Sequence, residues 1–229
     1  MERLKISDDS VLKHCNYRYE CSSCKKSVKY FCYFCHKCSP FLEGKIPVVD
    51  LAFSVDVIMH EGETEGKSTA VHAKLLASSQ VKIYSHLAEL PLYDNDNSVF
   101  LLYPSQHSIP ITNLAPNGVK KIIVIDGTWA QAKKIVKLPA IAHLPKISFE
   151  PRYTLFWRYQ PLGPSYLSTI EAIYYCCRDY MEAQRGSYHG QVDDLLWFFK
   201  FFYEIIQASY KSNLERTFNS RHSKDYIKY

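Results

Sequence analysis

Lys121-Ile-Ile-Val-Ile-Asp-Gly-Thr-Trp129 is the segment that decides the fold of this 229-residue chain. The apolar run from Ile122 to Ile125 predicts a strand that is buried on both faces, as strands of parallel sheets are. The carboxylate of Asp126 follows directly and is therefore placed at the carboxyl end of that strand. Residues 129–137 have the pattern of a short helix, which ends before Pro139. The segment thus combines a strand, a turn and a helix, which is the repeating unit of an α/β fold.

The rest of the body alternates predicted strands and helices around this segment. Further strands are expected at residues 55–59, 81–84, 98–103 and 152–158. Helices are expected from Ser68 to about Ser78, from the capping box Ser168-Thr-Ile-Glu171, and from Asp193 or Asp194 onward. The last helix is rich in aromatic residues, and we expect it to pack deeply against the sheet. The alternation predicts an α/β protein with a mostly parallel sheet.

Unusual polar chemistry lies where the predicted strands end, the place where parallel α/β sheets bind their ligands. Three segments occupy such positions: residues 60–66, 103–105 and 126–129. Asp126 has two possible roles there, a helix cap or a catalytic carboxylate. Gly127 permits a sharp turn or a close approach to a ligand. Thr128 could cap the following helix, and Trp129 could form the wall of a pocket.

Five of the eight cysteines lie within residues 21–38. Cys21-Ser-Ser-Cys24 and Cys32-Tyr-Phe-Cys35 are two C-x2-C pairs, and two such pairs complete a tetrahedral metal site. Four thiolates favour zinc, with an iron–sulfur cluster as the alternative. His36 and Cys38 are possible substitute ligands. Four sulfur ligands leave no open coordination position, so we expect a structural role for the metal.

The composition is typical of a protein with a sizeable apolar core and a small net positive charge. Apolar residues make up 47% of the chain, charged residues 22%, and the net charge is +5. That charge permits an anionic partner such as RNA without requiring one. The 18 Tyr, 12 Phe and 3 Trp could stack on unpaired bases or simply pack the core. No signal sequence is visible and no apolar run is long enough to span a membrane, so we expect an intracellular protein without a membrane partner.

The chain divides by composition into three parts. A bridge with Pro and Gly, Pro40 to Pro47, separates a metal knuckle at residues 15–40 from a catalytic domain expected at residues 46–212. Residues 213–229 form a polar tail. G-x-G-x-x-G, P-loop and G-x-S-x-G motifs are absent from the sequence. Their absence disfavours a Rossmann dehydrogenase, a P-loop NTPase and an α/β-hydrolase.

Taken together, these segments resemble the DTW-domain family of tRNA-uridine aminocarboxypropyltransferases, and most closely its eukaryotic branch. The D-x-T-W motif stands here as Asp126-Gly127-Thr128-Trp129, and the paired cysteines look like the family's N-terminal knuckle. Further similar motifs are Glu65-Gly-Lys-Ser-Thr-Ala70, His72-Ala-Lys-Leu-Leu76, Phe156-Trp-Arg158, Leu167-Ser-Thr-Ile-Glu-Ala-Ile-Tyr-Tyr175 and His189-Gly-Gln191. The resemblance spans about residues 20–210.

The resemblance implies a fold and a reaction. The fold would be similar to the SPOUT class, a mostly parallel α/β sheet with a C-terminal knot that binds S-adenosylmethionine. The reaction would transfer the 3-amino-3-carboxypropyl group of S-adenosylmethionine to N3 of a uridine in tRNA, with methylthioadenosine as the other product. The resemblance also favours the D-loop as the target and the nucleus over the cytoplasm. It does not indicate an oligomeric state.

Site residues follow from the same resemblance. Asp126, Thr128 and Trp129 would form the catalytic motif, with Asp126 as the candidate base for uridine N3. The residues that would contact S-adenosylmethionine are Thr69, Tyr103, Pro104, Ser105, Leu138, Trp157, Leu167, Ser168 and Thr169. Trp129 or Trp157 could stack on adenine or on the flipped uridine, or either ring could be ordinary core packing. The zinc ligands would be Cys21, Cys24, Cys32 and Cys35.

Two other functions are compatible with these residues. One is a SPOUT-type methyltransferase, which uses the same co-substrate but transfers its methyl group. The other is a non-catalytic zinc module that binds RNA, and the intact D-x-T-W motif argues against it.

Overall fold

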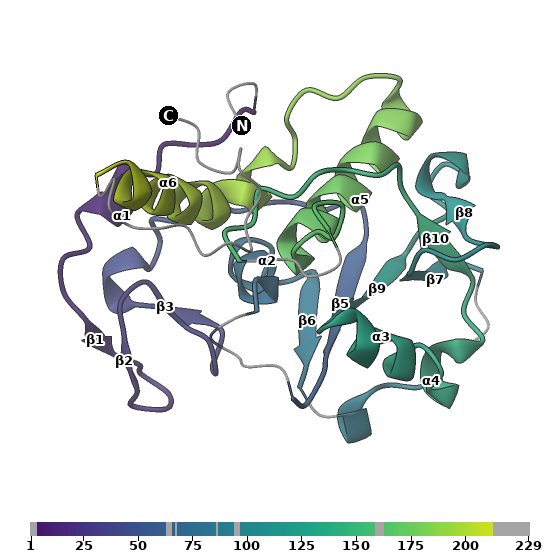
Figure 1. Cartoon of the computed structure of the whole chain (residues 1–229), viewed down its shortest axis with the longest axis horizontal. Helices are drawn as coiled ribbons and strands as arrows, with labels where there is room; N and C mark the ends of the chain where they lie inside the picture. Colours follow the sequence, from purple (N-terminus) through teal and green to yellow (C-terminus); the bar gives the residue numbers. More distant parts are fainter. Residues whose placement is uncertain are drawn as a thin grey trace.

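The structure, a computed structural model, describes residues 4–62, 66, 68–85, 87–93, 97–158 and 163–212 (Figure 1). Its centre is a six-stranded sheet in the order β6-β5-β9-β7-β10-β8. The strands in that order are Val81–Tyr84, Ser54–Met59, Lys121–Asp126, Val99–Leu102, Lys146–Ser148 and Ile109–Pro110. All neighbours pair in parallel, so the predicted parallel α/β sheet is confirmed. The expected polar tail, and Glu65 and Lys67 of the motif before the first long helix, lie outside the described residues.

Helices cover both faces of the sheet (Figure 1). Helices α2 (Ala70–Leu76) and α5 (Thr169–Arg185) share one apolar cluster with Val57 and Val124. Helices α3 (Trp129–Ile135) and α4 (Pro139–Ala142) share a second cluster with Ile58 and Ile123. Successive strand residues thus alternate between the two clusters, as the pleat of a strand requires. Both faces of the central strands are buried, which explains the continuous apolar run of β9.

The cysteine-rich segment forms two short antiparallel hairpins. One pairs β1 (Tyr19–Glu20) with β2 (Ser27–Val28), and the other pairs β3 (Phe31–Cys32) with β4 (Lys37–Cys38). We call residues 15–40 the cysteine module. Its Phe31 belongs to the main core cluster of the protein, so the module is packed against the body.

The last helix, α6 (Trp197–Lys211), follows the 3-10 helix η5 (Asp193–Leu196). We expected this helix against the sheet, but it lies over α2 and the cysteine module (Figure 1). The ring of Phe198 is 5.0 Å from that of Phe31 and 5.6 Å from that of His72, centroid to centroid. The aromatic face of α6 is thus matched by aromatic side chains of other elements, whereas α2 and α5 already cover the sheet.

The predicted strand at residues 152–158 is wrong. Its polar groups bond to a helix start instead of to a strand, because Glu171 accepts hydrogen bonds from Thr154 Oγ1 at 2.7 Å and from Leu155 N at 2.8 Å. The helix expected to begin at Ser68 begins at Ala70, after an N-cap at Thr69. Short helices elsewhere in the described residues are α1 (Ser10–Lys13), η1 (Pro40–Leu42), η3 (Leu87–Glu89) and η4 (Ile111–Asn113). Among the described residues, no helix combines the length and apolarity needed to cross a bilayer.

The buried His72 predicts acid sensitivity of the fold. It is 1% exposed, its Nδ1 has no hydrogen-bond partner within the described part of the chain, and burial lowers its pKa to about 3. The unfolded chain takes up this proton near pH 6.5, whereas the folded chain does not, so stability is lost as the pH falls from 6.5 toward 3. We expect this residue to contribute about 2 kcal/mol of destabilisation at pH 5.

Urea unfolding of the wild type and of His72→Leu between pH 7.5 and 5 measures this effect. The free energy of unfolding should fall less steeply with acid in the variant, because leucine takes up no proton. Parallel curves for the two proteins would show that His72 is not buried as a neutral ring.

Candidate active site

The side chain of Asp126, the last residue of β9, lies at the meeting point of three chain segments. It is 6% exposed. Its Oδ2 accepts a hydrogen bond from Ser68 Oγ at 2.5 Å, and its Oδ1 accepts one from Thr169 Oγ1. Ser68 precedes α2, and Thr169 is the first residue of α5. We call these three side chains the Asp126 network.

Burial raises the pKa of Asp126, and the hydrogen bonds from Ser68 and Thr169 oppose that rise. A carboxylate with a raised pKa is a stronger proton acceptor than an exposed one. A buried carboxylate is also costly unless its oxygens are bonded, which explains why both hydroxyls point at it.

Two further interactions fix the start of α5. Thr69 Oγ1 accepts a hydrogen bond from Ile170 N at 3.1 Å, a second link between the segments before α2 and at the start of α5. The carboxylate of Glu171 accepts from Ser168 N at 2.8 Å and from Ser168 Oγ at 2.6 Å, so the predicted capping box is confirmed. Burial raises the pKa of Glu171, while the hydrogen bonds it accepts lower that pKa. The first turn of α5 is therefore held in one position.

The residues after Asp126 have separate structural roles. A Cβ on Gly127 would lie 3.2 Å from His60 Cβ and 3.0 Å from Gln131 Oε1, so a side chain at this position would require both neighbours to shift. Thr128 is exposed and caps α3, since its N donates to Gln131 Oε1 at 2.6 Å and its Oγ1 accepts from Gln131 N at 3.4 Å. The expectation that Thr128 caps the helix is thus confirmed.

A cavity of about 420 Å³ opens beside this segment, at the carboxyl ends of β7, β9 and β10. Its size is in the range of small-molecule binding sites. The residues that line it are Leu102, Tyr103, Pro104, Val124, Ile125, Gly127, Trp129, Ala132, Ser148, Phe149, Pro151, Arg152, Ser165, Tyr166, Leu167, Thr169 and Ala172. The position agrees with the rule that parallel sheets bind ligands at this edge.

Five of the site residues expected from the sequence line the cavity: Tyr103, Pro104, Trp129, Leu167 and Thr169. Asp126, Thr69 and Ser168 stand behind the wall, in the buried hydrogen bonds around α5. The cavity lining does not include Ser105, Leu138, Trp157 or Thr128. Trp157 instead contacts the rings of Phe156, Phe199 and Phe202, with centroids 4.9 to 6.0 Å apart.

Aromatic rings and one charged side chain give the cavity its character. The Trp129 ring lies 5.8 Å from Tyr103 and 5.2 Å from Tyr166, centroid to centroid. Of the described residues that line the cavity, Arg152 is the only one with a charge. Its Nη2 donates to both carboxylate oxygens of Asp179 at 3.1 Å, which orients the guanidinium. Arg152 and Tyr166 were missed as site residues, because neither belongs to a motif that resembles the family.

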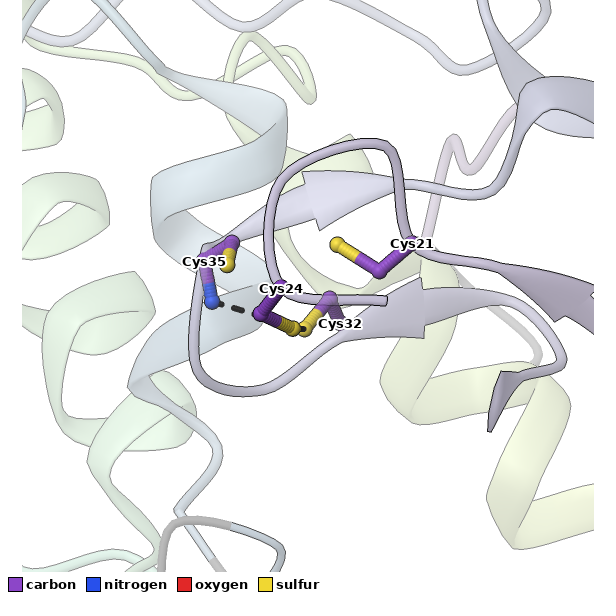
Figure 2. A group of neighbouring side chains, drawn as sticks. All are labelled: Cys21, Cys24, Cys32 and Cys35. Carbon is purple, nitrogen blue, oxygen red and sulfur yellow. Dashed lines mark hydrogen bonds between the residues drawn. The ribbon is translucent and has the colours of Figure 1, made fainter. Parts of the chain in front are cut away.

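The two C-x2-C pairs meet at one point of the cysteine module. Figure 2 shows the side chains of Cys21, Cys24, Cys32 and Cys35 gathered between the two hairpins, and their sulfur atoms all lie within 4.8 Å of one another. Cys35 N donates a hydrogen bond to Cys32 Sγ at 3.4 Å. The predicted four-cysteine group is therefore present and could hold a metal ion. Cys38 and His36, the possible substitute ligands, are not part of the group.

Comparisons with known proteins agree with the motifs. The DTW domain matches residues 18–207. A Xenopus tropicalis protein named tRNA-uridine aminocarboxypropyltransferase 1 is 33% identical, over 93% of this chain and 88% of its own. Relatives of the same name from Mus musculus and Homo sapiens are 34% and 32% identical, each over 90% of this chain and 84% of their own. Among solved structures, the SAM-dependent rRNA:acp-transferase Tsr3 from Vulcanisaeta distributa has a TM-score of 0.40 and 16% identity, covering 70% of this chain and 82% of that chain.

The four-cysteine group predicts a difference between two cysteines of the same module. Cys32→Ser removes one sulfur of the group and should abolish stoichiometric metal binding. Loss of a structural metal should also lower Tm, by on the order of 10 °C. Metal analysis of the purified protein together with thermal unfolding measures both effects.

Cys38→Ser is the matched control, because Cys38 lies outside the group. It should keep its metal. Equal metal loss in the two variants would mean that Cys38 is a ligand.

Proposed function

The chain belongs to the DTW-domain family, and on that premise we propose that it transfers the 3-amino-3-carboxypropyl group of S-adenosylmethionine to N3 of a uridine in tRNA. The observation that carries this proposal is that Gly127 and Trp129 of the DTW segment line the cavity at the carboxyl edge of the sheet, with Asp126 buried behind its wall. Relatives similar over most of their length are named for this reaction. By the family resemblance, we propose the D-loop of tRNA as the location of the target uridine.

The reaction requires a particular orientation of the co-substrate. The sulfonium of S-adenosylmethionine activates all three attached carbons, so the carbon that faces the nucleophile decides which group moves. In the proposed reaction, uridine N3 forms a bond to the carbon of the aminocarboxypropyl arm that is attached to sulfur. The carbon–sulfur bond breaks with its electron pair going to sulfur, which releases methylthioadenosine. The proton of N3 must pass to a base, because protonated N3 is a poor nucleophile.

The cavity offers distinct surroundings for the parts of S-adenosylmethionine. Trp129, Tyr103 and Tyr166 provide aromatic surface for a flat base such as adenine. Arg152, oriented by Asp179, provides a positive charge for the carboxylate of the arm. If the arm is held at its carboxylate, its sulfur-bound carbon, and not the methyl group, would face the incoming uridine.

Asp126 fits the role of proton acceptor through Thr169. Asp126 does not line the cavity, but Thr169 does, and the Thr169 hydroxyl donates to Asp126 Oδ1. We place the N3 proton on Thr169 Oγ1 as the hydroxyl proton of Thr169 passes to the carboxylate of Asp126. The charge is conserved in this step, and the raised pKa of Asp126 favours it.

The four-cysteine group fits a structural zinc ion. It supplies four thiolates from two short turns, which is the ligand set of closed zinc sites. Cys21, Cys24, Cys32 and Cys35 would hold the ion, and the ion would join the two hairpins where each has only two pairs of facing residues. The C-terminal knot implied by the resemblance stays a prediction.

Incubation of the protein with tRNA and labelled S-adenosylmethionine tests the proposed reaction. Label in the carboxyl group should enter the tRNA, and label in the methyl group should remain in methylthioadenosine. Mass spectrometry of the digested tRNA should locate the new group on a uridine. Transfer of the methyl label instead would identify a methyltransferase and contradict the proposal.

Two substitutions of Asp126 separate its structural role from its proton-accepting role. Asparagine keeps the shape and can still bond to both hydroxyls, so Asp126→Asn should fold and bind S-adenosylmethionine within a few-fold of the wild type. It cannot accept the proton, so the transfer rate should fall by about 100-fold or more. Alanine removes the network as well, and Asp126→Ala should lose about 2 kcal/mol of stability.

Single-turnover rates, calorimetric binding of S-adenosylmethionine and thermal unfolding provide the three measurements. An Asp126→Asn variant that keeps more than a tenth of the wild-type rate would show that Asp126 is not the proton acceptor.

A further inference from the structure

Positive charge is concentrated on the N-terminal part of the chain. Residues 13–45 contain seven Lys and Arg against two Glu, a net charge of +5 that equals the net charge of the whole chain. Arg18, Lys25, Lys26 and Lys37 are exposed on the two hairpins of the cysteine module. We call these four side chains, together with Phe34, the basic hairpin surface.

Within the described part of the chain, these cations have few acidic neighbours. Lys25 forms an ion pair with Glu20 at 3.2 Å, with both side chains largely exposed. Lys37 Nζ instead donates to Ser23 Oγ at 2.9 Å, and Arg18 donates to Ser27 Oγ at 2.9 Å and to Ser27 O at 2.7 Å. Serine partners orient the cations without neutralising them, so the surface keeps a positive potential that attracts a polyanion.

An exposed aromatic ring lies among the charges. Phe34 is 48% exposed, and Lys26 Nζ lies 2.9 Å from the centroid of its ring. Phe34 sits between Cys32 and Cys35, two members of the four-cysteine group, so the metal knuckle would fix its backbone. A large apolar side chain held outward on a knuckle suits stacking on an unpaired base, which is how single-stranded RNA is commonly recognised.

The basic hairpin surface is connected to the active site through neighbouring residues. Phe31, three residues before Phe34, lies 5.6 Å from the His72 ring of α2, centroid to centroid. Arg158 Nη2 donates to Gly66 O at 3.1 Å, and Gly66 lies two residues before Ser68 of the Asp126 network. Figure 1 shows the module on the β6 side of the sheet. RNA that crosses the hairpins would therefore approach the start of α2, where Ser68 belongs to the Asp126 network.

We propose that the basic hairpin surface docks the tRNA substrate, with Lys26 and Lys37 contacting phosphates and Phe34 stacking on an unpaired base. This inference rests on the proposed function for the identity of the RNA. It gives the cysteine module a role in substrate recognition besides its packing under α6. Binding of this kind depends on salt, because each phosphate contact releases a counterion.

Neutralisation of two lysines tests the electrostatic part. Lys26→Gln/Lys37→Gln should weaken tRNA binding on the order of tenfold at 0.1 M salt and reduce the slope of log affinity against log salt by about two. Lys5→Gln/Arg185→Gln is the matched control, since it removes the same charge from two exposed positions outside the module. The control should bind tRNA like the wild type. Fluorescence anisotropy with labelled tRNA over a salt series measures both.

The ring is tested by Phe34→Ala and Phe34→Trp. Alanine should weaken tRNA binding roughly tenfold, and tryptophan should restore it, because stacking needs a flat ring and not phenylalanine itself. Metal content and affinity for S-adenosylmethionine should stay at wild-type values in all four variants. These controls exclude damage to the fold or to the cavity.

The outcomes distinguish this inference from the proposed function. Equal tRNA affinity and equal salt slope in the lysine variant and the wild type would overturn the docking surface, even if the wild type transfers the aminocarboxypropyl group. That result would mean that the cations of the basic hairpin surface bind a different partner, such as an acidic protein. Absence of transfer by the wild type would contradict the proposed function, whatever the lysine variant does to binding.

Discussion

The buried carboxylate of Asp126 is the constraint on which the rest of the site depends. It accepts hydrogen bonds from Ser68 and Thr169, which lie 58 and 43 residues away in the sequence. One side chain thus joins the end of β9 to the segments before α2 and at the start of α5. A buried carboxylate without these donors would cost several kcal/mol, so the three segments come together or the site does not form. The cavity lies on the other side of this junction. Thr169 lines the cavity and also donates its hydroxyl hydrogen bond to Asp126.

Helix α2 lies between the Asp126 network and the cysteine module. It begins two residues after Ser68, and its His72 packs under the rings of Phe31 and Phe198. Phe31 belongs to the hairpin that carries Cys32 and Cys35, so the four-cysteine group and the Asp126 network bear on the same short helix. The cysteine module is therefore packed against the element that leads into the Asp126 network, and its exposed face carries the basic hairpin surface.

Local patterns in the sequence predicted much of this architecture. The apolar run of β9, the helix cap at Thr128, the capping box at Ser168 and the two cysteine pairs all appear as expected, because each depends on residues within a few positions of one another. The predicted position of α6 was wrong, because the pattern of aromatic residues along this helix is equally compatible with packing on the sheet and on the cysteine module. Trp157 is packed among phenylalanines and Arg152 lines the cavity, and both depend on contacts across more than 20 residues. No local sequence pattern shows whether such a side chain is packed in the core or lines the cavity.

The central claim is that Asp126 joins the two helix starts, and a double-mutant cycle on its two donors tests it most directly. Ser68→Ala and Thr169→Val each leave the carboxylate one donor, whereas the double variant leaves it none. The free energy of unfolding of the double variant should fall by more than the sum of the single losses, with a coupling of about 1 kcal/mol or more. Strictly additive losses would contradict the account, because they would mean that Ser68 and Thr169 are not linked through Asp126.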